Sequence, residues 1–254
     1  MIRKSLIYKT GVEYGDYTLN HVQGCSHGCK YPCYAFMMAK RFGKVKTYEE
    51  WTCPQSVENT MELLDKELPR FRGKIKTLHL CFTTDPFMYE HDDICDLSLA
   101  VLRKANAHGV TCSVLTKGIL PIALAELPRP NEYGITVVSL DDEFRKEYEP
   151  GAAAVEERIN ALKALSERGC STWVSIEPYP TPNIIKQNLG KLLEAIAFAD
   201  KIIFGRLHYN KVVSQYQEYQ KFYDECAEQV IQFCTARNIA YHIKNGTMSS
   251  VDGK

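Results

Sequence analysis

Apolar and polar positions along the chain follow two alternating patterns, short apolar runs and longer segments with helical spacing. The runs are rich in β-branched and other apolar residues and are bounded by glycine or polar residues, as buried parallel strands are. They lie at residues 74–83, 109–116, 134–140, 171–177, 201–205 and 239–243. This pattern predicts six short strands.

The segments between the runs carry apolar residues three or four positions apart, which indicates helices. They lie at residues 56–68, 96–109, 153–169, 185–199 and about 213–237. In the third of them, Val155, Ile159, Leu162 and Leu165 fall on one face, and Gly169 is suited to end the helix. Strands that alternate with helices over connections of this length form a parallel sheet.

These elements predict an α/β fold, a partial (β/α)6 TIM-type barrel with parallel strands, as one domain over residues 1–254. The chain has 254 residues, 45% of them hydrophobic, which is enough apolar material for one sizeable core. In such barrels the chemistry lies at the C-terminal ends of the strands. Polar segments follow four of the runs there, FTTDPF, TKG, SLDDE and IEPYP, and we expect functional residues in them.

The overall charge is balanced, with 31 basic and 31 acidic residues, so the net field favours neither nucleic acid nor membrane. No stretch approaches the ~18 consecutive apolar residues of a membrane span. The N-terminus lacks the apolar run of a signal peptide, and we expect a soluble cytoplasmic protein. Residues 39–46 and 66–76 concentrate cations among apolar residues, which could bind phosphate or be solvated surface lysines.

Ten cysteines are many for such a chain, and three of them are clustered. Isolated cysteines fill cores as small hydrophobes, and a reducing cytosol disfavours disulfides. We expect a core role for Cys53, Cys81, Cys95, Cys112, Cys170, Cys226 and Cys234. The other three, Cys25, Cys29 and Cys33, lie in a glycine-rich polar segment. Pro32 argues against a helix before Cys33, so a loop that curls round an ion or cluster, followed by a helix, is predicted.

Zinc is one candidate for this loop, although structural zinc sites use four ligands, often in CxxC pairs. The fourth ligand would have to be His21, His27 or Cys53. A 4Fe–4S cluster fits the pattern better, and it normally takes four thiolates. Three thiolates leave one iron open to a ligand that is not protein, and the amino and carboxylate groups of S-adenosylmethionine (SAM) can fill that position.

The chain resembles the radical SAM enzymes and, among them, the branch of spore photoproduct lyase. The resemblance rests on the stretches at residues 16–35, 82–90, 113–120, 138–169 and 176–180. They occur in this order, and the cysteine stretch is the most specific. Residues 181–254 carry no recognised motif and are expected to complete the barrel. The chain departs from the usual C-x3-C-x2-C spacing of the family, because Pro32 follows Tyr31 and moves the last cysteine one place on.

The resemblance implies that Cys25, Cys29 and Cys33 bind a 4Fe–4S cluster and that SAM is the second cofactor. In the family, backbone next to the last cysteine meets the adenine of SAM. At that position this chain has Tyr34.

The resemblance also places SAM beside the first two strand ends. In the family, polar groups at the position of Thr83, Thr84 and Asp85 bind the amino group, which needs hydrogen-bond acceptors. The alternative is a structural turn before a proline. Lys117 could pair with the cofactor carboxylate or be a solvated lysine after a strand.

Further cofactor contacts are expected at the next strand ends. Ser139 could bind the ribose or carboxylate of SAM, or close a turn with Asp141. Glu149 is expected in a structural ion pair, whereas Arg158 could reach the cofactor carboxylate. Glu177 could face the barrel mouth, where a buried carboxylate would need a cation, a hydroxyl or the cofactor as partner.

Three residues are candidates for catalysis. Lesion-repairing members of the branch use a cysteine near the first strand end as hydrogen donor, which suggests Cys81. Neighbouring strand residues face opposite sides, so Cys81 points away if Phe82 occupies the donor position, and core packing is its favoured role. His208 and Tyr209 lie in GRLHYN (205–210), which suits a substrate site or a surface loop.

The function implied by the resemblance is reductive cleavage of SAM to a 5'-deoxyadenosyl radical, which abstracts hydrogen from a substrate. A nucleic-acid lesion, a peptide and a small metabolite remain open as substrates. A low-potential electron donor of the flavodoxin or ferredoxin type is implied as a partner. The alternatives are a non-enzymatic zinc-binding or interaction module, and an enzyme that transfers another arm of the cofactor.

Overall fold

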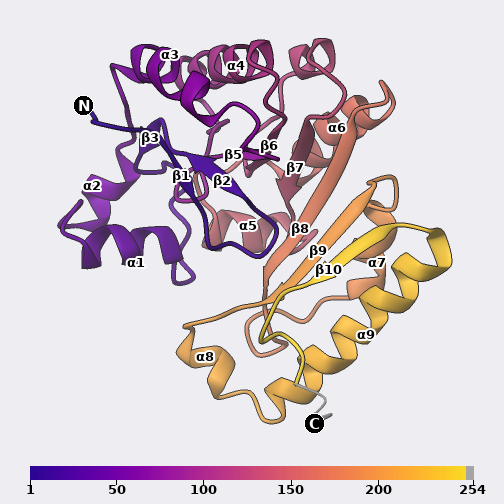
Figure 1. Ribbon diagram of the computed structural model, residues 1–254. Helices are drawn as coiled ribbons and strands as arrows, with labels where there is room; N and C mark the ends of the chain where they lie inside the picture. The colour runs from indigo at the N-terminus through magenta and orange to yellow at the C-terminus, as the bar shows by residue number, and fades with distance from the viewer. Residues whose placement is uncertain (250–254) are drawn as a thin grey trace, which may run out of the picture.

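The computed structural model describes residues 1–249, and eight strands in this range form one curved sheet (Figure 1). In sheet order they are β1 (Ile7–Lys9), β2 (Tyr17–Leu19), β5 (Leu78–Leu80), β6 (Cys112–Thr116), β7 (Glu132–Thr136), β8 (Ser171–Tyr179), β9 (Lys201–Arg206) and β10 (Ala240–Ile243). Only β1 is antiparallel to its neighbour among these strands. The predicted partial α/β barrel is confirmed, and each of β5 to β10 overlaps one of the six predicted runs, although β7 begins and ends earlier than predicted.

Helices connect the successive parallel strands. They are α1 (Tyr34–Arg41), α2 (Tyr48–Thr52), α3 (Thr60–Phe71), α4 (Asp92–Ala107), η1 (Ile122–Glu126), α5 (Asp142–Tyr148), α6 (Val155–Ser166), α7 (Leu189–Ala195), α8 (Lys211–Ser214) and α9 (Tyr219–Arg237). Figure 1 shows α3 and α4 together at one end of the sheet, α9 along the other end, and α1 and α2 side by side near the N-terminus. Within residues 1–249, no helix is both long and apolar enough to cross a membrane.

The predicted helices are all present with shifted ends, and two of the departures have a local cause. Helix α7 begins later than predicted because the Asn188 side chain accepts a hydrogen bond from the Lys191 N–H at 3.1 Å and caps the helix there. The predicted last helix is interrupted, since Glu218 adopts φ +58° between α8 and α9. A residue with positive φ cannot continue a right-handed helix.

The strands β1 and β2 were not predicted, nor was the small antiparallel sheet of β3 (Val22–Gln23) and β4 (Gln55–Ser56). Strand β2 is only three residues long and has a polar residue at its centre. That residue, Thr18, is buried and donates its hydroxyl to the His79 carbonyl at 2.9 Å. So short a segment has no measurable apolar period, which is why the sequence pattern missed it.

Most isolated cysteines occupy the core, as predicted. The buried ones are Cys81, Cys112, Cys170, Cys226 and Cys234. Cys95 is half-buried and packs against the main core. The prediction is wrong for Cys53, which is exposed because it directly follows the short surface helix α2.

Aromatic side chains fill the interior of the barrel between β5 and β8. Trp173 of β8 lies against Gly134 of β7, where any Cβ would collide with the indole ring. His79 of β5 stacks on Phe82, with ring centroids 3.7 Å apart. This packing leaves the loops at the C-terminal strand ends to build a site.

Candidate active site

The three clustered cysteines lie in the loop between β3 and α1. Gly24 has φ +86° and Gly28 has φ +59°, a left-handed conformation that suits glycine. A Cβ at position 24 would also meet the Trp51 carbonyl oxygen at 2.7 Å. Cys33 is the N-cap residue of α1, so the predicted order of a curled loop and then a helix is confirmed.

Backbone hydrogen bonds hold this cysteine loop against the segment that follows α5. The Lys30 N–H donates to the Tyr148 carbonyl at 2.8 Å, and the Gly151 N–H donates to the His27 carbonyl at 3.1 Å. A Cβ at position 151 would collide with the Ser26 carbonyl, so the close approach requires glycine. Because α5 follows β7, the loop lies over the C-terminal ends of the strands, where the barrel fold predicts the chemistry.

The three thiols are free and partly exposed. Burial and then the charges of the three cysteines raise the pKa of Tyr48 to about 12, and its hydroxyl donates to the Cys29 carbonyl at 3.0 Å. Burial and the nearby Asp85 carboxylate raise the pKa of Cys25 well above its ordinary value. Without metal the Cys25 thiol is therefore protonated, and metal ligation there would release its proton.

The donor set fits an iron–sulfur cluster. Burial raises the pKa of Cys29 to about 11, and the Lys117 Nζ, 3.5 Å from its Sγ, offsets part of that rise by favouring the thiolate form that a cluster requires. Within residues 1–249, no three His, Cys, Asp or Glu side chains converge on a point that would hold a single metal ion. A cubane takes one thiolate at each of three separate irons, so its ligands need not converge on one metal ion.

The histidines beside the loop are engaged within the protein. The His27 Nε2 accepts the Tyr89 N–H at 3.2 Å, so its Nδ1 carries the proton and lies 3.3 Å from the Asp85 carboxylate. Burial lowers the pKa of His27 to about 4, and the ring is neutral. His21 is fully buried, and both of its ring nitrogens contact other side chains. Neither histidine therefore has a free nitrogen for a fourth zinc ligand.

A buried ion network connects the cysteine loop with α6. The Glu149 carboxylate lies 3.1 Å from the Lys117 Nζ and 2.9 Å from the Arg158 Nη2. Tyr31 donates its hydroxyl to Glu149 and accepts from Lys117 at 3.0 Å. Burial raises the pKa of Glu149, but the two cations outweigh it and hold the pKa at about 2. Arg158 is 1% exposed and its other donors bind backbone carbonyls, so its guanidinium faces this network.

Asp85 ties three segments together at the strand ends. One carboxylate oxygen accepts from the Phe87 N–H at 2.9 Å and from the Thr116 hydroxyl at 2.7 Å. The other accepts from the Lys117 N–H at 2.9 Å and faces His27 at 3.3 Å. Both oxygens are thus used to position the β5 and β6 loops against the cysteine loop.

The two threonines before Asp85 point toward the strand that leads into the cysteine loop. The Thr83 hydroxyl donates to the Asn20 Oδ1 at 2.9 Å, and the Thr84 hydroxyl donates to the Val22 carbonyl at 3.4 Å. In these bonds each hydroxyl acts as a donor. Its oxygen lone pairs can therefore accept a hydrogen bond from an incoming ammonium or amine.

Cys81 is buried on the side of α4. It has φ +61°, its Sγ lies 3.5 Å from the His21 Nδ1, and the His21 Nε2 lies 2.7 Å from the Ser98 Oγ. Burial raises the pKa of Cys81 to about 12. This position is the one expected of a core-packing cysteine, beside the cysteine loop but turned toward α4.

Two other predicted residues have partners within the protein. Ser139 is buried and its hydroxyl accepts the Asp141 N–H at 3.1 Å, which is the strand-end turn considered from the sequence. The Glu177 carboxylate lies 2.9 Å from the Lys244 Nζ. Lys244 directly follows β10, and it supplies the cation that a half-buried carboxylate requires.

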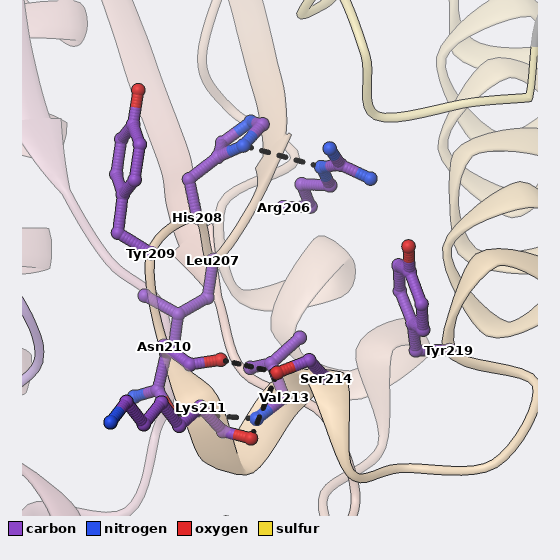
Figure 2. Close-up of a pocket in the computed structure, with 9 residues that line it drawn as sticks. All are labelled: Arg206, Leu207, His208, Tyr209, Asn210, Lys211, Val213, Ser214 and Tyr219. Atoms are coloured by element: carbon purple, nitrogen blue, oxygen red, sulfur yellow. Dashed lines mark hydrogen bonds between the residues drawn. The ribbon is translucent and has the colours of Figure 1, made fainter.

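A cavity of about 350 Å³ lies at the C-terminal end of β9, and its lining includes Arg206, His208 and Tyr209 (Figure 2). The Arg206 Nε donates to the His208 Nδ1 at 3.3 Å, so the His208 Nε2 carries the proton. The Tyr209 ring is exposed and stacks beside Tyr34, with centroids 6.4 Å apart and planes 23° apart. The cavity therefore adjoins the end of the cysteine loop through this tyrosine pair.

The structure gathers most predicted site residues around the cysteine loop. The first group comprises Cys25, Cys29, Cys33, Thr83, Thr84, Asp85, Lys117 and Arg158. The second links the loop to the cavity through Tyr34, Tyr209 and His208. Sequence reasoning considered His27 only as a possible zinc ligand, and it missed Tyr31 and Lys244 as site residues. Tyr31 lies between two of the cysteines and Lys244 follows the last predicted strand, and neither has a distinctive pattern of its own.

Comparison with known sequences identifies one protein family and several curated relatives. The sequence profile of the Radical SAM superfamily matches residues 19–196. The uncharacterized protein MJ0683 of Methanocaldococcus jannaschii is 28% identical over 178 residues, which cover 69% of this chain and 64% of that protein. The match therefore spans less than two thirds of that relative's length.

Two solved structures share the fold. A spore photoproduct lyase variant with bound AdoMet and dinucleoside spore photoproduct gives a TM-score of 0.68 at 12% identity, covering 95% of this chain and 80% of that chain. SuiB of Streptococcus suis bound to its precursor peptide SuiA gives a TM-score of 0.52 at 14% identity, covering 71% and 41%. At these identities the likeness shows the fold alone.

Proposed function

This chain belongs to the radical SAM superfamily, whose members bind a 4Fe–4S cluster and SAM, and we propose that Cys25, Cys29 and Cys33 hold the cluster here. When bound and reduced, the two cofactors supply a 5'-deoxyadenosyl radical that abstracts hydrogen from a substrate. One observation carries the assignment: three partly exposed thiols share one curled loop at the C-terminal strand ends, with a lysine ammonium 3.5 Å from one sulfur.

The residues around the loop have separate proposed roles. Thr83 and Thr84 offer acceptor lone pairs to the amino group of SAM, and Asp85 holds their loop in place. Lys117 places a positive charge beside Cys29, where it also lies within reach of a bound carboxylate. Tyr34 offers a flat exposed ring next to the last cysteine for the adenine.

The remaining predicted contact residues, Arg158, Ser139 and Glu177, have proposed roles in positioning other parts of the site. Arg158 positions Glu149 and through it Lys117. Ser139 shapes the turn after β7, and Glu177 with Lys244 closes the side of the barrel mouth formed by β8 and β10. Each of these side chains acts through a neighbour in this structure.

The cavity at the end of β9 is the proposed substrate side of the site. The guanidinium of Arg206, the protonated Nε2 of His208 and the Tyr209 ring suit a substrate with hydrogen-bond acceptors and a flat or apolar part. The two structural neighbours bind a dinucleoside and a peptide, and both kinds of molecule carry such groups.

The test of this function is the fate of SAM. Anaerobically purified protein, reduced with dithionite and mixed with SAM, is expected to release 5'-deoxyadenosine and methionine in equal amounts, measured by liquid chromatography and mass spectrometry. Omitting dithionite should abolish both products. An intact cluster that gives no 5'-deoxyadenosine would overturn the proposal, and methylthioadenosine in its place would indicate transfer of the aminocarboxypropyl arm.

A further inference from the structure

The segment that contains the cluster ligands is strongly basic although the chain as a whole is neutral. Residues 25–48 include no aspartate or glutamate and five cations. These cations are exposed: Lys30, Lys40, Arg41, Lys44 and Lys46. Among residues 1–249, none of the five forms an ion pair, and the nearest acids in sequence are Glu49 and Glu50 at the start of α2.

The outer face of α1 adds exposed apolar side chains to this charge. Met37 is 39% exposed, and Phe42, at the end of the helix, is 66% exposed. Met37 and Arg41 lie four positions apart and share a face of the helix. We call Met37, Lys40, Arg41, Phe42 and Lys44 the α1 surface. It combines two exposed apolar side chains with three exposed cations, a mixture that protein-docking patches also use.

The opposite face of α1 lies against the cluster ligands. Ala39 packs with Trp51 in a small core that Cys25 and Cys33 also contact. Cys33 is in addition the N-cap residue of the helix. An α-helix is about 10–12 Å across, so the α1 surface lies roughly one helix diameter from the proposed cluster.

We propose that the α1 surface is the docking site of an acidic one-electron donor protein that reduces the cluster. This inference rests on the proposed function, because only a bound cluster needs such a partner. In the step, the donor loses one electron and the cluster gains one, with no bond made or broken. Within residues 1–249 the other cysteines do not gather into a metal-binding group. The electron must therefore come from outside this part of the chain.

A protein donor fits this surface better than a nucleic acid. Binding to a nucleic acid is dominated by contacts of cations with phosphates, to which the exposed phenyl of Phe42 and thioether of Met37 contribute little. Transient protein complexes instead combine a small apolar contact with charged rims that steer the encounter. On the α1 surface an acidic partner would meet three exposed cations in the same segment as the cluster ligands.

The test compares two triple variants of the full chain with its cluster. The first, Lys40→Gln, Arg41→Gln and Lys44→Gln, neutralises the α1 surface. The matched control, Lys163→Gln, Lys186→Gln and Lys191→Gln, removes three exposed cations on and near α6 and α7. The probe is reduced flavodoxin, a small acidic flavoprotein, and the second-order rate of cluster reduction is followed by visible absorbance. Binding of oxidised flavodoxin is measured by calorimetry as an independent readout.

At low salt, the cluster of the α1 variant is expected to be reduced by flavodoxin at least about tenfold more slowly than that of wild type. Electrostatic steering raises association rates by roughly 10–1,000-fold. The difference should vanish at about 1 M salt, where the Debye length is ~3 Å. The control variant should match wild type. Photoreduced 5-deazariboflavin, a small uncharged reductant, should reduce all three proteins equally and give 5'-deoxyadenosine from each with SAM.

Equal flavodoxin rates and affinities in the α1 variant and wild type would overturn the docking site while leaving the proposed function intact. A wild-type dimer that the α1 substitutions dissociate would assign the surface to a second copy of this chain. Single-stranded DNA binding that the α1 variant loses, with an unchanged flavodoxin rate, would assign it to nucleic acid. Either of these two results would overturn the proposal. Failure of 5'-deoxyadenosine release with the uncharged reductant would instead contradict the proposed function.

Discussion

Replacing Cys29 by alanine is expected to abolish both the bound iron and the cleavage of SAM. Loss of a residue that merely supports a metal ligand typically costs about 10–100-fold in metal affinity or activity, and loss of a ligand should cost more. We therefore expect less than about one hundredth of the wild-type 5'-deoxyadenosine release. The measurement is iron content and product yield of anaerobically purified Cys29→Ala protein, reduced with dithionite.

Cys53→Ala is the matched control for this variant. Cys53 lies in the same part of the fold and is exposed, but it follows α2 and is not one of the three clustered thiols. It should keep full iron content and full product yield. If Cys29→Ala retained its iron, or if Cys53→Ala lost it, the three-thiol assignment would be wrong.

Glu149→Gln is expected to have the second largest effect, on stability. Glu149 is the shared anion of Lys117 and Arg158, and it is almost fully buried. Breaking a buried ion pair by removing one charge costs about 3–5 kcal/mol, because the partner is left buried and uncompensated. For a chain of this size that lowers the midpoint of thermal unfolding by roughly 10 °C. Anaerobic circular dichroism during heating measures it.

The control for this substitution is Glu143→Gln, the same chemical change at the surface. The Glu143 carboxylate lies 2.7 Å from the Lys146 Nζ, and both side chains are exposed. Exposed ion pairs contribute about 0–1 kcal/mol, so the midpoint should move by no more than a few degrees. Equal midpoints for the two variants would show that the network around Glu149 is not a stabilising element.

The parallel strands and the helices between them could be predicted because their signal is repeated along the chain. Each buried strand such as β6 or β9 is an apolar run between polar breaks, and α6 carries a clear apolar face. Strand β2 was not predicted because three residues with a buried threonine show no apolar periodicity. Its place in the sheet depends on pairing with β5. Long-range pairing of so short a strand produces no pattern in the local sequence.

The cysteine loop was predictable for a chemical reason, since few structures need three thiols within nine residues. Its supporting side chains were less visible. Tyr31 was noted only as part of an unusual spacing, whereas in the structure its hydroxyl joins Lys117 and Glu149. The partner of Glu177, Lys244, lies 67 positions away in sequence, and such pairs follow from the closing of the sheet and not from any local pattern.

The central claim is that the cysteine loop binds a cluster with one iron open to SAM. The most direct measurement is metal and sulfide analysis of anaerobically purified protein together with Mössbauer spectroscopy before and after SAM is added. We predict about four iron and four sulfide per chain, and a change confined to one of the four irons when SAM binds. A colourless protein with one zinc per chain would contradict the account. So would a cluster whose Mössbauer spectrum does not change when SAM is added.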